Sequence, residues 1–450
     1  MRRVLLIADA YPPRPGIGSV RPGGLAKYLP SFGWEPLVLT RRLPDGPRPR
    51  ARVIETAYRS SAEVWQARLG LDVTLAFSHQ LDKLPLPLAS TPRFNRLYLR
   101  LIRRGQSLMS YPDSVKGWIP FALRAITEVG PRGGVDAILS TGPPVSCHLI
   151  ARRAKDILGC AWVADFRDLW TQNQYYPYGA VRRFVEERLE RKTLRAADAL
   201  VTVSAPLADL LRGRYQPQPI HCIPNGFDPD EFPLGSYEPV KCFSITYTGS
   251  FYQGKRSPEL LFTVIEDLLR EGILPRTAVQ LHFYGPRDPW LLALIERYRL
   301  KDVVTCHGYV PRSVSLRAQR ASQLLLLPRW DDPREAGVFT GKVFEYLGAR
   351  RPIIALGGPP GVVPDLLRET KAGVHVISKA QLRAFLTEAY GGFQRSGHVP
   401  YAGDETTINR YTHQEMAGKF ARVLDTVTGE TQPATRFQPT RQPPSCTNDS

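Results

Sequence analysis

The sequence predicts an α/β fold of two Rossmann-like, doubly wound domains that face each other across a cleft. Three observations lead to this prediction. The chain has 450 residues, more than one ordinary hydrophobic core accommodates. Two series of short apolar segments alternate with amphipathic stretches, which is the pattern of parallel strands joined by helices. A short segment rich in proline, 229–240, separates the two series and has the composition of a linker.

The apolar segments of the two series predict the strands of each domain. In an N-terminal domain of residues 1–228, we expect strands at 3–8, 35–40, 137–140, 161–165, 199–204 and 221–224. In a C-terminal domain of residues 241–404, we expect strands at 244–248, 280–284, 303–307, 323–328 and 352–356. The span 43–111 is rich in proline and arginine and fits the alternation least, so we interpret it as an insertion. A run compatible with a helix follows at 405–428, and the Thr-, Gln- and Pro-rich residues 429–450 predict a disordered tail.

One predicted helix of the second domain has the features of an anion-binding site. Residues 341–348 (GKVFEYLG) predict a helix that runs into an apolar strand and glycines at 351–358. A helix N-terminus presents unpaired N–H groups and a positive dipole end, so it suits a phosphate, and Lys342 adds a charge there. Glu345, one turn further, can accept hydrogen bonds from sugar hydroxyls. The alternative is an ordinary amphipathic helix on which Lys342 and Glu345 form a solvated pair.

Glycines also follow the first predicted strand. At Gly16 and Gly18 the backbone can approach a phosphate or a sugar closely, because no side chain intervenes. The spacing is not that of the dinucleotide-binding motif, since Val20 and Arg21 fill the place of its third glycine. A plain turn between strand and helix is the alternative.

Six motifs, in order along the chain, carry a resemblance to a known family. They lie at 11–22 (YPPRPGIGSVRP), 33–36 (GWEP), 197–204 (ADALVTVS), 223–228 (IPNGFD), 247–256 (YTGSFYQGKR) and 341–358. Through them the chain resembles the family-four glycosyltransferases, which have the GT-B fold. Residues 165–170 (DFRDLW) resemble a subgroup of that family with a D-F-R-D-x-W motif.

The resemblance implies a hexosyltransferase-type enzyme that moves a sugar from a nucleoside-diphosphate sugar to a hydroxyl acceptor, with retention of configuration and without a metal. It implies that Glu345 binds the ribose hydroxyls, and that Lys255 or Arg256 neutralises the departing diphosphate. It also implies that the helix at 405–428 crosses back onto the first domain. Arg21 becomes a candidate contact for the acceptor or a phosphate. The donor-binding residues so implied are Gly16, Gly18, Gly249, Lys255, Arg256, Gly285, Val310, Thr340, Gly341, Lys342 and Glu345.

The chain departs from the family pattern where a glutamate usually contacts the donor sugar. That position, eight residues before Glu345, is Gly337. Either Glu335 takes the role through a longer loop, or backbone groups of 337–341 contact the sugar. We name Glu335 as a candidate catalytic residue.

A second departure lies after the strand at 161–165. Many relatives carry a His-Asp pair there, whereas this chain has Arg167 and Asp168. Arginine cannot act as a general base at neutral pH, but it can bind a phosphate or a sugar hydroxyl, with Asp168 orienting it or accepting from the acceptor. Arg167 and Asp168 are therefore candidate catalytic residues, and a structural ion pair is the alternative.

We expect no metal ion and no resident cofactor. The D-x-D arrangement at 228–230 lies in the linker and contains a proline, and the six cysteines form no C-x-x-C pair, so reduced thiols are expected. No apolar run approaches the ~20 residues that cross a bilayer. The apolar run 4–8 is too short for the core of a signal peptide, so we expect a cytoplasmic protein.

The net charge of +18 is unusual and concentrated near the N-terminus. Residues 1–120 hold 19 Lys or Arg against 8 Asp or Glu. Within the insertion, arginines at helical spacing opposite apolar residues are typical of a helix at an anionic membrane surface, and solvated arginines on a packed helix are the alternative. No zinc-finger, RNP-like or basic-zipper pattern accompanies the charge, so we expect no nucleic-acid partner. The membrane-surface candidates are Arg93, Arg96, Arg100, Arg103 and Arg104.

The leading hypothesis is therefore a glycosyltransferase of cell-envelope polysaccharide or glycolipid synthesis, peripheral at the inner face of the membrane, with a lipid-linked acceptor. Two alternatives stay open. One is a nucleotide-sugar epimerase, since some of these share the GT-B fold. The other is a non-catalytic GT-B scaffold, which the glycine at 337 suggests.

Overall fold

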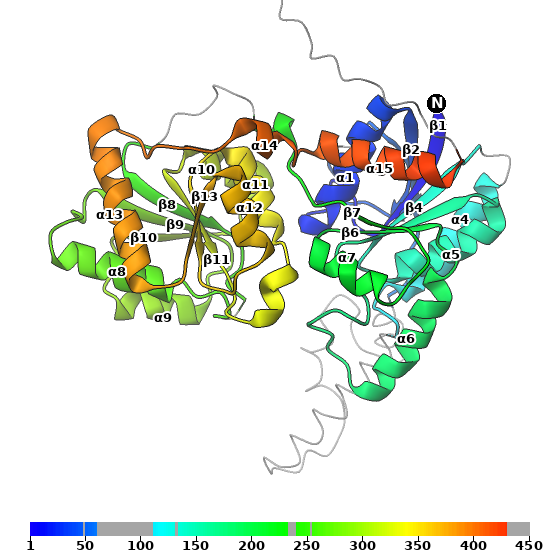
Figure 1. The fold of residues 1–450 in the computed structure, drawn as a ribbon, viewed down its shortest axis with the longest axis horizontal. Helices are drawn as coiled ribbons and strands as arrows, with labels where there is room; N and C mark the ends of the chain where they lie inside the picture. Colours follow the sequence, from blue (N-terminus) through cyan, green and yellow to red (C-terminus); the bar gives the residue numbers. More distant parts are fainter. Residues whose placement is uncertain (48–49, 61–110, 131–133, 233–239, 253, 430–450) are drawn as a thin grey trace, which may run out of the picture.

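The computed structural model describes residues 1–47, 50–60, 111–130, 134–232, 240–252 and 254–429. It contains two parallel sheets, each covered by helices on both faces, which lie side by side as two domains (Figure 1). This arrangement confirms the predicted α/β fold of two doubly wound domains.

The N-terminal sheet has the strand order β3-β2-β1-β4-β5-β6-β7, and every neighbouring pair is parallel. Its central strands are buried on both faces, as their continuous apolar runs predict. The strands are β1 Arg2–Ala8, β2 Trp34–Arg41, β3 Arg52–Thr56, β4 Ala137–Gly142, β5 Ala161–Phe166, β6 Ala199–Thr202 and β7 Ile220–Cys222.

Strand β3 corrects the interpretation of the span 43–111 as an insertion from its first residue. This strand pairs with β2 and forms an edge of the sheet. Its residues are exposed or half-buried, and only two apolar residues stand between the charged Arg52 and Glu55, so it lacks the apolar run of a central strand. Residues 61–110, with the five candidate membrane-surface arginines, lie outside the described residues.

Helices from both ends of the chain cover the N-terminal sheet. On one face lie α1 Val20–Tyr28 and α15 His413–Val427, whose apolar side chains share one core with β1 and β2. On the other face lie α4 Ile119–Val129, α5 Ser146–Leu158, α6 Ala180–Leu194 and α7 Ala205–Arg212.

The C-terminal sheet repeats this topology, with the order β10-β9-β8-β11-β12-β13. Its strands are β8 Phe243–Thr248, β9 Val279–Tyr284, β10 Val304–Gly308, β11 Leu324–Pro328, β12 Ile353–Leu356 and β13 Gly373–Val376. The short edge strand β13, half-buried over most of its length, was not predicted. Helices α8 Glu259–Arg270, α9 Pro289–Arg297 and α13 Lys379–Ser396 cover one face, and α10 Arg312–Ala321, α11 Gly341–Ala349 and α12 Val362–Thr370 cover the other.

Two segments connect the domains and run side by side. Phe227 forms a parallel bridge with Thr412, and Gly226 leaves no room for a side chain, because a Cβ would lie 2.5 Å from the carbonyl oxygen of Tyr411. After α14 Glu405–Asn409 the chain passes this bridge and enters α15, which packs on the N-terminal domain (Figure 1). The continuous helix predicted at 405–428 is therefore two helices, and the side chain of Thr412 caps the second.

Candidate functional site

The two domains enclose a cleft of about 2160 Å³ at the carboxyl ends of their sheets. In each sheet the strand order reverses beside the first strand, between β1 and β4 and between β8 and β11. In parallel α/β sheets ligands bind outside such reversal points. The loop after β1 forms one wall of the cleft, and the loops after β8 and β11 form the opposite wall.

The two walls approach each other closely at Gly341. A Cβ at this position would lie 2.5 Å from the side chain of Ile17, which belongs to the loop after β1. Gly16 in the same loop also lines the cleft, with a φ of 110° that favours glycine. These contacts bring the N-terminus of α11 against the glycine-containing loop of the other domain.

The centre of the C-terminal wall is formed by Gly249 and Lys342. A Cβ on Gly249, whose φ is 141°, would lie 1.9 Å from the Cε of Lys342. The glycine therefore creates the space in which the lysine lies. Among the described residues none accepts a hydrogen bond or forms an ion pair with the Lys342 Nζ. Burial, and secondarily the charge of Arg256, lowers the pKa of Lys342 to about 8.

The N-terminus of α11 lies beside this lysine. Thr340 is the N-cap, but its side chain makes no capping hydrogen bond. Free N–H groups at the start of a helix attract anions. Arg256 is 16% exposed and lines the same wall, with its Nη2 3.5 Å from Oε2 of Glu335. The arrangement of Lys342, Arg256 and the start of α11 can hold a diphosphate.

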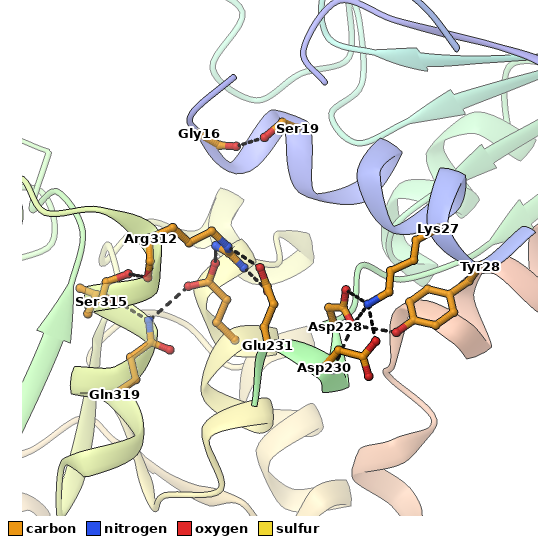
Figure 2. A network of polar contacts seen from close by, with 12 residues as sticks. Gly16, Ser19, Lys27, Tyr28, Asp228, Asp230, Glu231, Arg312, Ser315 and Gln319 are labelled. Atoms are coloured by element: carbon orange, nitrogen blue, oxygen red, sulfur yellow. Dashed lines mark hydrogen bonds and ion pairs between the residues drawn. The ribbon is translucent and has the colours of Figure 1, made fainter. Parts of the chain in front are cut away.

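Glu345 is buried one turn into α11 and is held by two side chains of α10. Arg312 forms an ion pair with its Oε1, and the Nε2 of Gln319 donates to its Oε2 at 3.3 Å. Figure 2 shows that Arg312 also reaches Glu231, on the segment between the domains, at 2.8 Å. The same segment is bound from the N-terminal domain, where Lys27 contacts Asp228 and Asp230 (Figure 2).

Two candidate carboxylates face the cleft from opposite domains. Asp168 lies at the N-terminal wall, where removal of its carboxyl from bulk water raises the pKa and the charge of Arg167 opposes the rise. Glu335 is 5% exposed at the C-terminal wall and accepts a hydrogen bond from the hydroxyl of Tyr175. A carboxylate therefore lines each wall of the cleft.

The structure corrects two predicted contacts. Arg21 is 2% exposed and does not reach the cleft; its guanidinium binds both carboxylate oxygens of Asp165, at 3.0 and 2.8 Å, and backbone carbonyls of 223–224. Arg167 donates to the carbonyls of Gly142, Pro143 and Gly18 and does not line the cleft either. Both arginines stabilise the loops behind the N-terminal wall.

The remaining predicted donor-site residues fall into two groups, one that lines the cleft and one that does not. Gly18 lies behind the wall and contributes only its carbonyl, as the acceptor for Arg167. Lys255 lines the cleft, but its Nζ lies 4.4 Å from the ring centre of Trp330. The other predicted donor-site residues that line the cleft are Gly285, Val310 and Thr340.

Sequence reasoning missed three cleft residues. Tyr175 and Trp330 meet across the domains, and Arg312 holds Glu345. Four aromatic residues follow Asp168 within 170–178, and this accumulation was the signal available for Tyr175. Arg312, at the start of α10, and Trp330, in the loop after β11, gave no such signal, because a single residue without a repeated spacing carries no pattern.

No group of three or more His, Cys, Asp or Glu side chains able to hold a metal ion occurs within the described residues. In the same part of the chain, every helix is too short or too polar to span a bilayer.

Comparisons with known proteins agree with this architecture. Residues 23–231 match the family model described as Glycosyltransferase Family 4. Together with the two-domain cleft, this match decides the class of protein. The chain is a glycosyltransferase. The search of curated proteins found no match.

Solved structures place the glycosyltransferase among GT-B folds. Sucrose-phosphate synthase from Thermosynechococcus elongatus is 15% identical, with a TM-score of 0.60 over 95% of this chain and 99% of that one. HepE from Anabaena, solved in complex with UDP, is 13% identical, with a TM-score of 0.60 over 95% and 100%. WaaG, a glycosyltransferase involved in lipopolysaccharide biosynthesis, is 15% identical, with a TM-score of 0.51 over 95% and 100%. At these identities the likeness establishes the fold.

Proposed function

We propose that the enzyme transfers a sugar from a nucleoside-diphosphate donor to a hydroxyl acceptor, with retention and without a catalytic metal. The observation that carries the proposal is Lys342, a largely buried cation without a hydrogen-bond or ion-pair partner among the described residues, placed at the N-terminus of α11 and against Gly249. A buried unpaired charge is costly, so its retention is explained by an anion that completes the site.

The proposed diphosphate contacts supply the leaving-group chemistry. When the bond between the sugar and the β-phosphate breaks, negative charge accumulates on the phosphate oxygens. Lys342, Arg256 and the N–H groups of α11 are fixed donors that stabilise this charge without reorganising. The departing phosphate then takes the acceptor proton on the same face of the sugar, which retains the configuration. The chain's own cations perform the role that a metal ion has in other enzymes.

The nucleoside is proposed to lie beside Glu345. Its carboxylate accepts from the ribose hydroxyls, while Arg312 and Gln319 fix its orientation. Anabaena HepE, which shares the fold, is solved with UDP and with UDP-glucose. Uridine nucleotides are therefore the first donors to test.

The acceptor is proposed to be an envelope polysaccharide or glycolipid, presented at the inner face of the membrane. The net charge of +18 favours a surface of anionic lipids. WaaG, which shares the fold, takes part in lipopolysaccharide biosynthesis.

The experiment that tests the donor site is the thermal stability of the purified enzyme with UDP, GDP, ADP or dTDP. A ligand at a hundred times its dissociation constant adds about 2.7 kcal/mol of stability. One nucleotide should raise the melting temperature clearly more than the others. If none of the four changes it, the proposed donor site is wrong.

The affinity for that nucleotide should fall as the pH rises. Lys342 has a pKa of about 8 in the free enzyme and attracts the diphosphate only when protonated. Because the protonated fraction drops from about nine-tenths at pH 7 to one-tenth at pH 9, affinity should fall about tenfold over this range. Calorimetric titrations at several pH values measure the change, and the nucleoside with the same base, without phosphates, serves as the control ligand. Constant affinity across this range would exclude Lys342 as the phosphate contact.

A further inference from the structure

The two domains contact each other at Gly337, the position eight residues before Glu345 where the family pattern has a glutamate. The Oγ of Ser204, in the N-terminal domain, donates to the carbonyl of Gly337 at 2.7 Å. A Cβ on Gly337 would lie 3.1 Å from the side chain of Pro206. Glycine at 337 therefore lets the two domains meet here, and a glutamate at this position would press against the opposite wall. The carboxylate of the same loop lies two residues earlier, at Glu335.

Glu335 is held in place by its own loop. It belongs to a short 3-10 helix, Pro333–Gly337, whose start is capped by the side chain of Asp332. The Glu335 carboxylate contacts Arg256, the cation that we place on the diphosphate, at 3.5 Å. The donor sugar is covalently attached to that diphosphate. Glu335 therefore lies next to the position that we expect for the sugar.

The other contact of Glu335 comes from the opposite domain. The hydroxyl of Tyr175 donates to its Oε1. The Tyr175 ring stacks on Trp330, with ring centres 5.1 Å apart and planes inclined by 17°. Its backbone N–H is fixed by Asn173 at 2.8 Å, and the carbonyl of Gln174 accepts from Arg334 at 3.1 Å. Tyr175 is thus held on both sides of the cleft.

We propose that Tyr175 completes the donor-sugar subsite from the acceptor-side domain, by orienting the Glu335 carboxylate toward the hydroxyls of the bound sugar. This inference rests on the proposed function. An ionised carboxylate accepts about four hydrogen bonds, and the hydroxyl of Tyr175 takes one of these positions, while Arg256 forms an ion pair at 3.5 Å with the other oxygen. In the proposed complex, hydroxyl groups of a hexose take remaining positions. Tyr175, Trp330 and Glu335 line the cleft together with Lys342, so one molecule can contact the phosphate and sugar subsites at once.

A consequence is that the sugar is recognised by both domains together. A nucleoside diphosphate alone needs Lys342, Arg256 and Glu345, which all belong to the C-terminal domain. The sugar additionally needs Tyr175, which belongs to the N-terminal domain. Tyr175 is therefore a positioning residue whose loss weakens the binding of the sugar and spares the nucleotide.

The test compares Tyr175→Phe with wild type by calorimetric titration. The ligands are the nucleoside diphosphate that stabilises the enzyme best and its glucose, galactose and N-acetylglucosamine derivatives. The phenylalanine keeps the stacking on Trp330 and loses only the hydroxyl. Because a hydrogen bond to a charged group is lost, the tightest sugar nucleotide should bind about tenfold more weakly, and the nucleoside diphosphate less than twofold more weakly. A Glu335→Gln variant should lose the same preference, and the double variant little more, because the two residues act as a unit.

Tyr411→Phe is the matched control. Tyr411 does not line the cleft, and its hydroxyl donates to Oε2 of Glu369 at 3.0 Å, so the variant removes the same kind of hydrogen bond away from the site. Both affinities should stay unchanged. Equal weakening of both ligands in Tyr175→Phe, or no change, overturns the inference while the donor site stands. If no nucleotide binds wild type, the proposed function fails first.

Discussion

Replacing Lys342 by methionine should make the enzyme more stable and abolish its tight binding of nucleotide. The lysine is a largely buried cation whose ionised form the protein disfavours, as its lowered pKa indicates. Methionine fills a similar volume without this cost, so the free energy of unfolding at pH 7 should rise by roughly 1–3 kcal/mol. Loss of the contact with the diphosphate should cost about 2–3 kcal/mol of binding, or roughly a hundredfold in affinity.

The sign of the pH dependence gives a second readout for this variant. The folded-state pKa of Lys342 lies below its ordinary value of 10.5, so the unfolded chain binds more protons between pH 8 and 10.5. This lysine therefore makes wild type gain stability as the pH rises through that window, and Lys342→Met should lack its contribution. Urea unfolding at pH 7 and pH 9.5 measures both effects.

Lys301→Met is the matched control for this prediction. Lys301 is 70% exposed and pairs with Glu296 on the surface. Its replacement should change stability by less than about 0.5 kcal/mol and leave nucleotide affinity unchanged. A Lys342→Met enzyme that is less stable and still binds nucleotide would show that the lysine is structural.

Replacing Arg21 by methionine should destabilise the N-terminal domain by about 3–5 kcal/mol. Its partner Asp165 is fully buried and receives further support only from Thr141 among the side chains described, at 2.8 Å. Removing the arginine leaves an uncompensated buried carboxylate. It also frees the carbonyls of 223–224, which begin the segment that leads to the C-terminal domain. Urea unfolding measures the loss.

Two further variants separate the possible roles of Arg21. Arg21→Met combined with Asp165→Leu should recover part of the stability, because both charges are then absent. Arg212→Met, which breaks an exposed pair with Asp209, should cost little. Below its unfolding temperature, Arg21→Met should bind nucleotide like wild type. If binding is weakened while stability is unchanged, the hypothesis that Arg21 contacts a phosphate would stand again.

The sequence predicted those parts of the fold that depend on local pattern. The apolar runs of the central strands, the turn at Gly249 and the helix that begins at Gly341 follow from residues close together in the chain. The edge strands β3 and β13 were missed, because partly exposed strands carry polar residues and lose the apolar signal.

The interactions that sequence reasoning misassigned or missed join distant residues. Arg21 was predicted to contact the acceptor or a phosphate, because its partner Asp165 stands 144 positions away and the sequence does not show that the two meet. Tyr175 and Glu335 are separated by 160 positions and meet only because their two domains lie against each other in the fold. A single sequence shows which residues can be charged or aromatic, but the partner that fixes their role comes from the tertiary fold.

The most direct test of the account is transfer itself. The enzyme is incubated with its best-binding sugar nucleotide, labelled in the sugar, and with a membrane extract, in the presence of EDTA. We predict that label moves to a hydroxyl acceptor with retained configuration, that an equal amount of nucleoside diphosphate is released, and that Lys342→Met loses both. Label that stays on the nucleotide, or that reappears as an epimeric sugar nucleotide, would contradict the proposed transferase function.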